Sequence, residues 1–277
     1  SYFRLSAAGS EMRESAMRDY AVCLARLGSV GEAGDVLAKL RTQGANSDVT
    51  RYVEGEVAYA SGDYAEGEKI FVEILENADD LSIKQRAFRS LAGLYRECAS
   101  LEMLGDSPIE DAAVKEAKLL LTGIGEYGLS YDSALYEMLG KAAYEASVLA
   151  ASKEVDLGSD YRIVAIDAFE RVLELGMKKE YIYGNLYSIH YEMGNHEAAE
   201  EVLTRMETAF PKSYVPHALR GVLLITVENA KPEAERDYSG AEAEYEAAGN
   251  LLSGTEDEAY YEQLGGLISR LREQGWL

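Results

Sequence analysis

Long hydrophobic runs and cysteines are both scarce in this chain of 277 residues. The longest candidate run, at 222–227, is far shorter than the ~20 apolar residues that a membrane-spanning helix needs. We therefore expect no direct membrane insertion of this segment. Cys23 and Cys98 are the only cysteines, which excludes a disulfide framework and a cysteine-based metal site.

Basic charge is also scarce. Lysine and arginine together number 27 against 49 aspartates and glutamates, so the formal net charge is −22. A nucleic-acid binder needs a basic face that overcomes such a field, so we expect no nucleic-acid partner. Hydrophobic residues nevertheless make up 47% of the chain, which is enough to bury a core. A single globular core would be strained at this length, whereas an array of repeats would not.

The first residues, 1–4, include no methionine, and no signal peptide is recognisable after them. We expect the chain to be a segment of a longer protein, with residues 1–10 as an N-terminal flank left from a preceding segment. The sequence leaves the cellular compartment of the protein undecided. A cytoplasmic location is favoured, and an extracytoplasmic one applies if the parent protein has a membrane span before this segment.

A short motif recurs along the chain. Residues 28–33 read GSVGEA and residues 62–67 read GDYAEG, which places their first glycines 62 − 28 = 34 positions apart. Residues 194–199, GNHEAA, keep the same local pattern. A period of 34 residues around a glycine turn indicates an array of helix pairs. Such arrays bind partners along an extended surface more often than they catalyse reactions in a pocket.

Apolar residues at helical spacing predict a helix on each side of these turns. The clearest helix pairs are expected at 11–27 with 32–43, at 48–61 with 65–77, and at 180–193 with 196–209. Three further pairs depart from the regular spacing by insertions at 100–107, about 150–160 and 229–237. A last helix at 256–274 is expected to cap the stack, with Trp276 folded back onto it.

Small and large residues alternate in these pairs as helix packing requires. The positions that carry the pattern are Gly55, Tyr64, Gly67 and Phe71 in the second pair and Leu186, Gly194, Ala199, Leu203 and Pro211 in the fifth. The pattern resembles the tetratricopeptide repeat (TPR) family. This resemblance implies an all-α, TPR-like α-solenoid of about six helix pairs plus a C-terminal capping helix, wound as a right-handed superhelix. The repeat array would cover 11–255, and the capping helix and tail 256–277.

Candidate catalytic and cofactor motifs are weak. Residues 123–128, GIGEYG, match the letters of a phosphate-binding loop, but they follow a predicted helix and are read as a helix–helix turn. His190, His196 and His217 lack the spacing of a zinc site, and His190 is expected to be buried against a neighbour. No combination of acid, base and nucleophile emerges. We therefore expect no enzyme activity, no cofactor and no metal.

Certain first-helix positions face the concave groove of a TPR array, so the resemblance assigns groove residues to this chain. They are Arg18, Arg26, Tyr52, Glu56, Tyr59, Arg86, Arg89, Arg96, Lys141, Tyr144, Tyr181 and Tyr191. Arginine forks suit carboxylates and tyrosine provides rigid contact area. The leading hypothesis is thus a non-catalytic scaffold whose groove binds a carboxylate-bearing protein or peptide segment. The alternative reading of these residues, a solvated face with salt bridges between repeats, stays open.

Two further segments suggest a parent protein. Residues 231–238, KPEAERDY, and 275–277, GWL, resemble the C-terminal TPR region of some Gram-positive bacterial serine/threonine protein kinases. This resemblance implies, as the alternative function, a regulatory or dimerisation segment of a larger signalling kinase. This alternative includes a homodimer.

Overall fold

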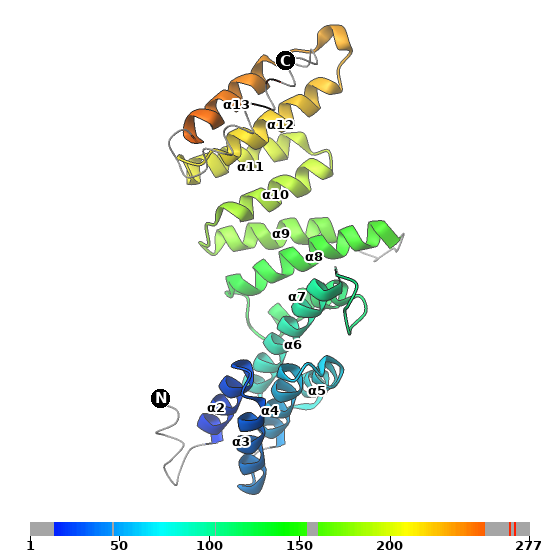
Figure 1. The fold of residues 1–277 in the computed structure, drawn as a ribbon, viewed down its shortest axis with the longest axis vertical. Coiled ribbons are helices and arrows are strands. Elements are labelled where there is room, and N and C mark those ends of the chain that lie inside the picture. The colour runs from blue at the N-terminus through cyan, green and yellow to red at the C-terminus, as the bar shows by residue number, and fades with distance from the viewer. Residues whose placement is uncertain are drawn as a thin grey trace. The chain divides into compact units, whose positions relative to one another are not determined.

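The computed structural model describes residues 14–45, 47–102, 104–153 and 160–252, together with the single residues 266 and 269. Within these residues the secondary structure is helical and contains no strand (Figure 1). Nor does any helix among them have the length and apolar character to cross a lipid bilayer. Apart from residues 266 and 269, the predicted last helix at 256–274 falls outside the described residues, as do the tail and the capping role of Trp276.

The helices follow one another as the repeat period predicts. The first six are α2 (Glu14–Arg26), α3 (Val30–Thr42), α4 (Ser47–Ala60), α5 (Tyr64–Asn77), α6 (Leu81–Glu102) and α7 (Ala112–Glu126). The next six are α8 (Ser133–Lys153), α9 (Tyr161–Glu174), α10 (Glu180–Glu192), α11 (His196–Ala209), α12 (Val215–Asn229) and α13 (Ser239–Leu252). A helix is therefore present for each member of the six predicted pairs.

The chain forms two compact units, Ser1–Ala168 and Phe169–Leu277, with a boundary inside α9. Each unit is an array of paired helices. The prediction that 11–255 forms one continuous array stays a prediction, as does the right-handed superhelix expected for the whole of it.

The repeated turns have the backbone that their glycines predict. Gly28, Gly62 and Gly194 have φ values of 78°, 79° and 73°, a left-handed conformation that glycine adopts most easily. At the start of α5, the Asp63 side chain caps the helix by accepting a hydrogen bond from the Glu66 backbone N–H at 3.2 Å. The motif thus ends one helix and begins the next within a few residues.

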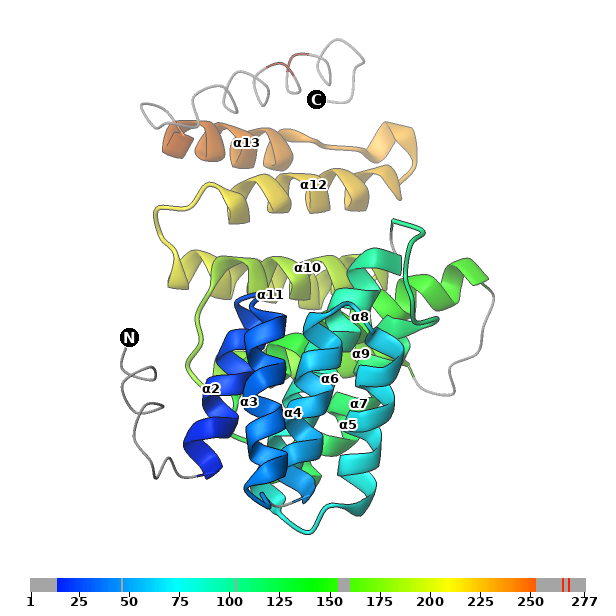
Figure 2. The same ribbon diagram turned by 60° about the horizontal axis from the view of Figure 1, so that its bottom comes forward.

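Packing in the first unit is that of successive repeats. The helices of each pair lie against each other, and α2 also contacts α4, which in turn contacts α6 (Figure 2). Gly55 lies in α4 where the pair is closest, because a Cβ atom there would lie 2.7 Å from Cε1 of Phe71. This contact confirms the small helix-contact position predicted from the sequence. The contacts of α4 with α2 and with α6 make these three first helices neighbours.

In the second unit, α10 packs on α11, α11 on α12, and α12 on α13. Ala199, predicted as a small contact residue, is fully buried. At the last pair Tyr245 is buried with Ala248 and Leu252, and its ring covers the backbone of Gly221. Each helix from α10 to α12 thereby packs against the next one.

The irregular pairs differ from the predicted boundaries. Helix α6 extends 22 residues and reaches Glu102, into the insertion expected at 100–107, and α7 begins only at Ala112. Helix α8 likewise continues to Lys153, so part of the second insertion is helical. The insertion at 229–237 contains a short 3-10 helix, Glu233–Glu235, and Arg236 donates from Nε to the Lys231 carbonyl oxygen at 3.1 Å.

Candidate functional site

A concave pocket of about 640 Å³ opens along the first helices α2, α4 and α6 of the first unit. The side chains that give it chemical character are Arg26, Glu56, Tyr59, Tyr64, Arg89 and Glu97. Four of these, Arg26, Glu56, Tyr59 and Arg89, belong to the groove residues assigned from the sequence. The pocket therefore brings together four of the eight groove residues predicted in the first three repeats.

The floor of the pocket is a buried carboxylate with four hydrogen-bond donors around it. Glu56 is 1% exposed, and it accepts from Arg26 through Nε–Oε2 at 3.0 Å and Nη2–Oε1 at 2.9 Å. Tyr52 donates its hydroxyl to Oε1 at 2.7 Å, and Ser90 donates its own to the same oxygen. The hydrogen bond with Glu56 raises the pKa of Arg26, which keeps this guanidinium charged. The network joins α2, α4 and α6.

Tyr52 and Glu56 therefore differ from their expected role as groove surface. Tyr52 is only 2% exposed, and its ring packs against Phe71 with the centroids 6.2 Å apart. Burial, followed by the charge of Glu56, raises the pKa of Tyr52. These two residues hold Arg26 in place. Arg26 itself keeps 61% of its side chain exposed.

At the other end of the pocket, two tyrosines share one carboxylate. Tyr59 donates to Oε2 of Glu97 at 2.8 Å, and Tyr64 donates to Oε1 at 2.7 Å. The two rings lie 5.9 Å apart, tilted at 54°. The hydrogen bond to Glu97 raises the pKa of Tyr64 to about 12, and burial together with the same carboxylate raises that of Tyr59. Both hydroxyls therefore stay protonated and keep Glu97 oriented.

Arg86 and Arg89 of the α6 stripe pair with acids on α2 and in the turn before α8. The Nη1 atom of Arg86 lies 3.3 Å from Oδ1 of Asp19, and Arg89 bonds Asp132. Arg89 nevertheless remains 44% exposed and lines the pocket. The ion pairs of Arg86 and Arg89 agree with the alternative reading, in which these arginines form salt bridges between repeats. Of the three arginines in the stripe, Arg89 lines the pocket.

Arg96, the third arginine of the stripe, belongs to a separate buried network. It pairs with Glu145, and its Nε lies 3.5 Å from Oε2 of Glu116. Glu116 is fully buried, and neither of its oxygens accepts a hydrogen bond. Burial raises the pKa of Glu116 to about 8, outweighing the opposite effect of the nearby Arg96 charge. The side chain of Arg96 therefore links α6 to acidic residues of α7 and α8.

The remaining groove residues assigned from the sequence lie elsewhere. Arg18 is nearly buried and pairs with Asp19 at 3.0 Å, and Lys141 contacts Glu137 at 2.6 Å on its own helix. Tyr144 is half-buried on α8. Tyr181 and Tyr191 are in the second unit, where the Tyr191 hydroxyl lies 2.7 Å from the hydroxyl oxygen of Thr226. None of these residues lines the pocket.

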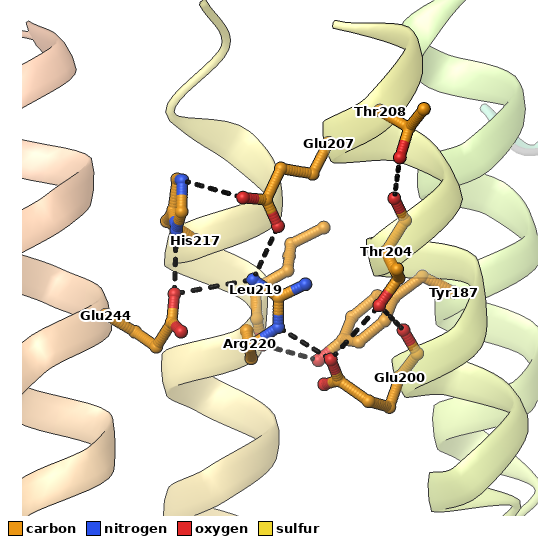
Figure 3. A network of polar contacts seen from close by, with 9 residues as sticks. All are labelled: Tyr187, Glu200, Thr204, Glu207, Thr208, His217, Leu219, Arg220 and Glu244. Carbon is orange, nitrogen blue, oxygen red and sulfur yellow. Dashed lines mark hydrogen bonds and ion pairs between the residues drawn. The ribbon is translucent and has the colours of Figure 1, made fainter. Parts of the chain in front are cut away.

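A polar network connects α11, α12 and α13 in the second unit (Figure 3). Arg220 is 11% exposed and meets three carboxylates: Nε lies 2.7 Å from Glu200, and Nη1 lies 3.1 Å from Glu207 and 3.5 Å from Glu244. His217 also faces two of them, with Nδ1 2.7 Å from Glu244 and Nε2 3.7 Å from Glu207. The network fixes α12 between its neighbours.

The weak motifs have structural explanations. Gly123 and Gly125 lie inside the last turns of α7, so the GIGEYG segment begins within a helix and turns only at Gly128. His190 is half-buried, with a buried Nδ1 that has no hydrogen-bond partner. In the described part of the chain, no three histidine, cysteine or acidic side chains gather as metal ligands would.

Sequence reasoning missed Tyr64, Ser90 and Glu97 as pocket residues. Tyr64 is one of the positions that carry the repeat pattern, and in the structure it is the first residue of α5. Glu97 follows Arg89 and Gly93 at steps of four residues, the spacing of neighbours on one helix face, so its position was readable from the arginine stripe. Ser90 carried no signal, because its role depends on the buried carboxylate of α4.

No family profile matches this sequence, and no curated protein shows significant similarity to it. Several solved structures do have a similar fold. The crystal structure of the MamA protein matches with a TM-score of 0.50 at 18% identity, over 77% of this chain and 94% of that one. Pseudomonas aeruginosa PilF gives a TM-score of 0.47 at 13% identity, over 90% of this chain and 98% of that one.

A monomeric mutant of IFIT1, solved with Gppp-AAAA, has a TM-score of 0.47 at 19% identity. It covers 99% of this chain, which spans only 59% of that protein. All three are helical repeat proteins of the TPR type. At these identities a likeness concerns the fold alone, and the match to MamA agrees with the turn motif and the packing of successive first helices. The chain therefore has the all-α, TPR-type solenoid fold.

Proposed function

We propose that this chain is a non-catalytic scaffold that binds a protein segment in the pocket along α2, α4 and α6. The observation that carries the proposal is the pocket itself. It holds two guanidiniums, Arg26 and Arg89, that remain 61% and 44% exposed although each is already paired. Exposed cations in a concave site are rare features for a chain with a net charge of −22.

Both arginines have donors left for a carboxylate. A guanidinium carries five N–H groups in a planar fork. Arg26 uses Nε and Nη2 on Glu56 and Ser90, and Arg89 uses Nη1 on Asp132. The remaining groups can bind an aspartate, a glutamate or a terminal carboxylate of the partner. The rest of the surface is acidic and repels anions, which favours binding of the carboxylate at these two arginines.

Selection from a random peptide library displayed on phage, against the full 277-residue chain, tests the proposal. We expect enriched peptides that carry a carboxylate and bind more weakly as salt is added, because exposed charges are screened over ~8 Å at physiological ionic strength. Arg89→Glu should weaken their binding by at least about tenfold, with the helical circular dichroism unchanged. An absence of enriched peptides, or enriched peptides without acidic residues, would overturn the proposal.

Arg41→Glu is the matched control. Arg41 lies on α3, is 56% exposed, pairs with Glu54 and does not line the pocket. Both substitutions reverse one exposed charge that is already paired, so their effect on the net charge is the same. If Arg41→Glu weakens binding as much as Arg89→Glu, the peptides respond to overall charge and the pocket is not the binding site.

The kinase alternative concerns the parent protein and not this pocket. Its sequence support lies in 231–238, which forms the turn between α12 and α13, and in 275–277, outside the described residues. A regulatory segment that dimerises would have twice the chain mass of 30.4 kDa in light scattering. A monomer that still selects peptides supports the scaffold, whereas a dimer without peptide binding supports the alternative.

A further inference from the structure

The charges that line the pocket are not all compensated. Glu56 is neutralised by Arg26, and Arg89 by Asp132. Glu97 accepts hydrogen bonds from Tyr59 and Tyr64, but it forms no ion pair with any of the described residues. The lining charge that lacks an opposite charge is therefore a carboxylate.

We propose that Glu97, Tyr59 and Tyr64 form a second subsite in this pocket, which binds a basic side chain of the same partner segment. The inference rests on the proposed function and extends it from an acidic ligand to a dipolar one. Its occupant is the ammonium of a lysine or the guanidinium of an arginine. An acidic group at Arg26 and Arg89 and a basic group at Glu97 would then fix the direction of the segment.

The geometry of the subsite favours a cation. Each oxygen of Glu97 accepts one hydrogen bond, from the Tyr59 hydroxyl at 2.8 Å and from the Tyr64 hydroxyl at 2.7 Å, and each keeps a further lone pair for a ligand. The carboxylate is thereby held in one orientation before any ligand arrives, which lowers the entropic cost of binding. The two tilted rings beside it, 5.9 Å apart, can add cation–π attraction.

The space between the two subsites is open. Gly93 lies midway between Arg89 and Glu97 on α6, and a Cβ atom there would meet only the Tyr59 hydroxyl, at 3.9 Å. Arg89 and Glu97 are eight residues apart, which corresponds to about 12 Å along a helix axis. An extended segment advances about 3.3 Å per residue, so its acidic and basic residues should be three or four positions apart.

The basic subsite can be tested without knowing the partner. The probe is N-acetyl-lysinamide, which carries an ammonium but no carboxylate, and the readout is the NMR signals of the Tyr59 and Tyr64 rings in the full chain. We expect a saturable shift that N-acetyl-norleucinamide, without the charge, does not produce. Glu97→Gln should weaken the lysinamide titration by about tenfold or more, which corresponds to about 1.4 kcal/mol.

Glu76→Gln is the matched control, since Glu76 is an exposed carboxylate on α5 that does not line the pocket. It should leave the titration unchanged. If lysinamide produces no saturable shift, or if Glu76→Gln lowers its affinity as much as Glu97→Gln, the basic subsite does not exist. This result is independent of the acidic subsite, because the probe has no carboxylate to bind Arg26 or Arg89.

Peptides from the phage selection separate the two proposals. In a peptide with both charges, replacing its lysine by norleucine should cost about tenfold in the native chain and little in Glu97→Gln. Replacing the glutamate of the peptide by glutamine should likewise lower its affinity about tenfold in the native chain and little in Arg89→Gln. Coupling to Arg89 without coupling to Glu97 overturns the basic subsite and leaves the proposed function intact, whereas no coupling to Arg89 overturns the acidic site.

Discussion

Arg26 and Glu56 join the first helices of two successive repeats by two hydrogen bonds, Nε to Oε2 at 3.0 Å and Nη2 to Oε1 at 2.9 Å. The carboxylate is buried while the guanidinium remains largely exposed. This asymmetry gives one ion pair two tasks. Its buried half holds the repeats together, and its exposed half presents a fixed cation to the pocket.

Glu56→Ala should therefore destabilise the first unit by about 1–3 kcal/mol, the cost of leaving buried hydroxyls without an acceptor, since the guanidinium of Arg26 stays exposed to water. The variant leaves the hydroxyls of Tyr52 and Ser90 without their acceptor. Urea denaturation followed by circular dichroism measures the loss. Glu54→Ala on the same helix is the control, because Glu54 pairs with Arg41 and Arg51, which are both partly exposed, and its loss should cost about 0–1 kcal/mol. Equal losses for the two variants would contradict the structural role of Glu56.

Gly123 and Gly125 should respond in opposite directions to alanine. A Cβ atom at Gly123 would lie 2.2 Å from Cε2 of Phe88, whereas one at Gly125 would meet nothing within 4 Å. Gly123→Ala should destabilise the chain by about 1–3 kcal/mol through overpacking. Gly125→Ala should stabilise it by about 0.5–1 kcal/mol, because alanine loses less entropy in a helix. Thermal melts of both variants decide the matter, and a stabilising Gly123→Ala would mean that α6 and α7 pack differently.

Glu116 should make stability depend on pH. Burial raises its pKa from 4.5 to about 8 in the folded chain. Below both values the residue is protonated in both states and its stabilising contribution is complete. As pH rises between them, the unfolded chain releases the proton first, so the contribution is lost at up to about 1.4 kcal/mol per pH unit until the folded pKa is passed.

Glu116→Gln should remove this dependence. The difference in unfolding free energy between the variant and the native chain should grow in favour of the variant from about pH 5 to pH 8. Glu126→Gln, at an exposed position of the same helix, should give a difference that stays flat. A flat profile for Glu116→Gln as well would show that this carboxyl titrates normally.

Arg220→Met should lower the unfolding free energy of the second unit. The substitution leaves Glu200, Glu207 and Glu244 close together without the cation that they share. Since these carboxylates are partly exposed, the cost should be about 2–3 kcal/mol, below that of a fully buried pair. Arg205→Met is the control, because its pair with Glu170 is about one-third exposed on both sides and should cost about 0–1 kcal/mol. Urea denaturation that shows no difference would assign the network no structural role.

The sequence by itself determined the repeat architecture. The glycines that open residues 28–33 and 62–67 permit a left-handed turn at a fixed period, and Gly55 lets the Phe71 ring approach its helix closely. These are local signals, because the turn conformation and the helix-contact positions are set by residues close in the chain. The helix pairs, their order and the first-helix location of the groove residues follow from them.

Only the tertiary structure decided which side chains of the groove are surface and which are core. Arg89 and Arg96 lie on one helical stripe, yet Arg89 lines the pocket while Arg96 pairs with Glu116 and Glu145 between helices. The partners of each arginine are 20 or more residues away along the chain, so no local pattern shows them. Glu97 became part of the pocket for the same reason, because the two tyrosines that hold it come from α4 and α5. Burial and charge pairing are properties of the packed helices, and these decided which residues can meet a partner.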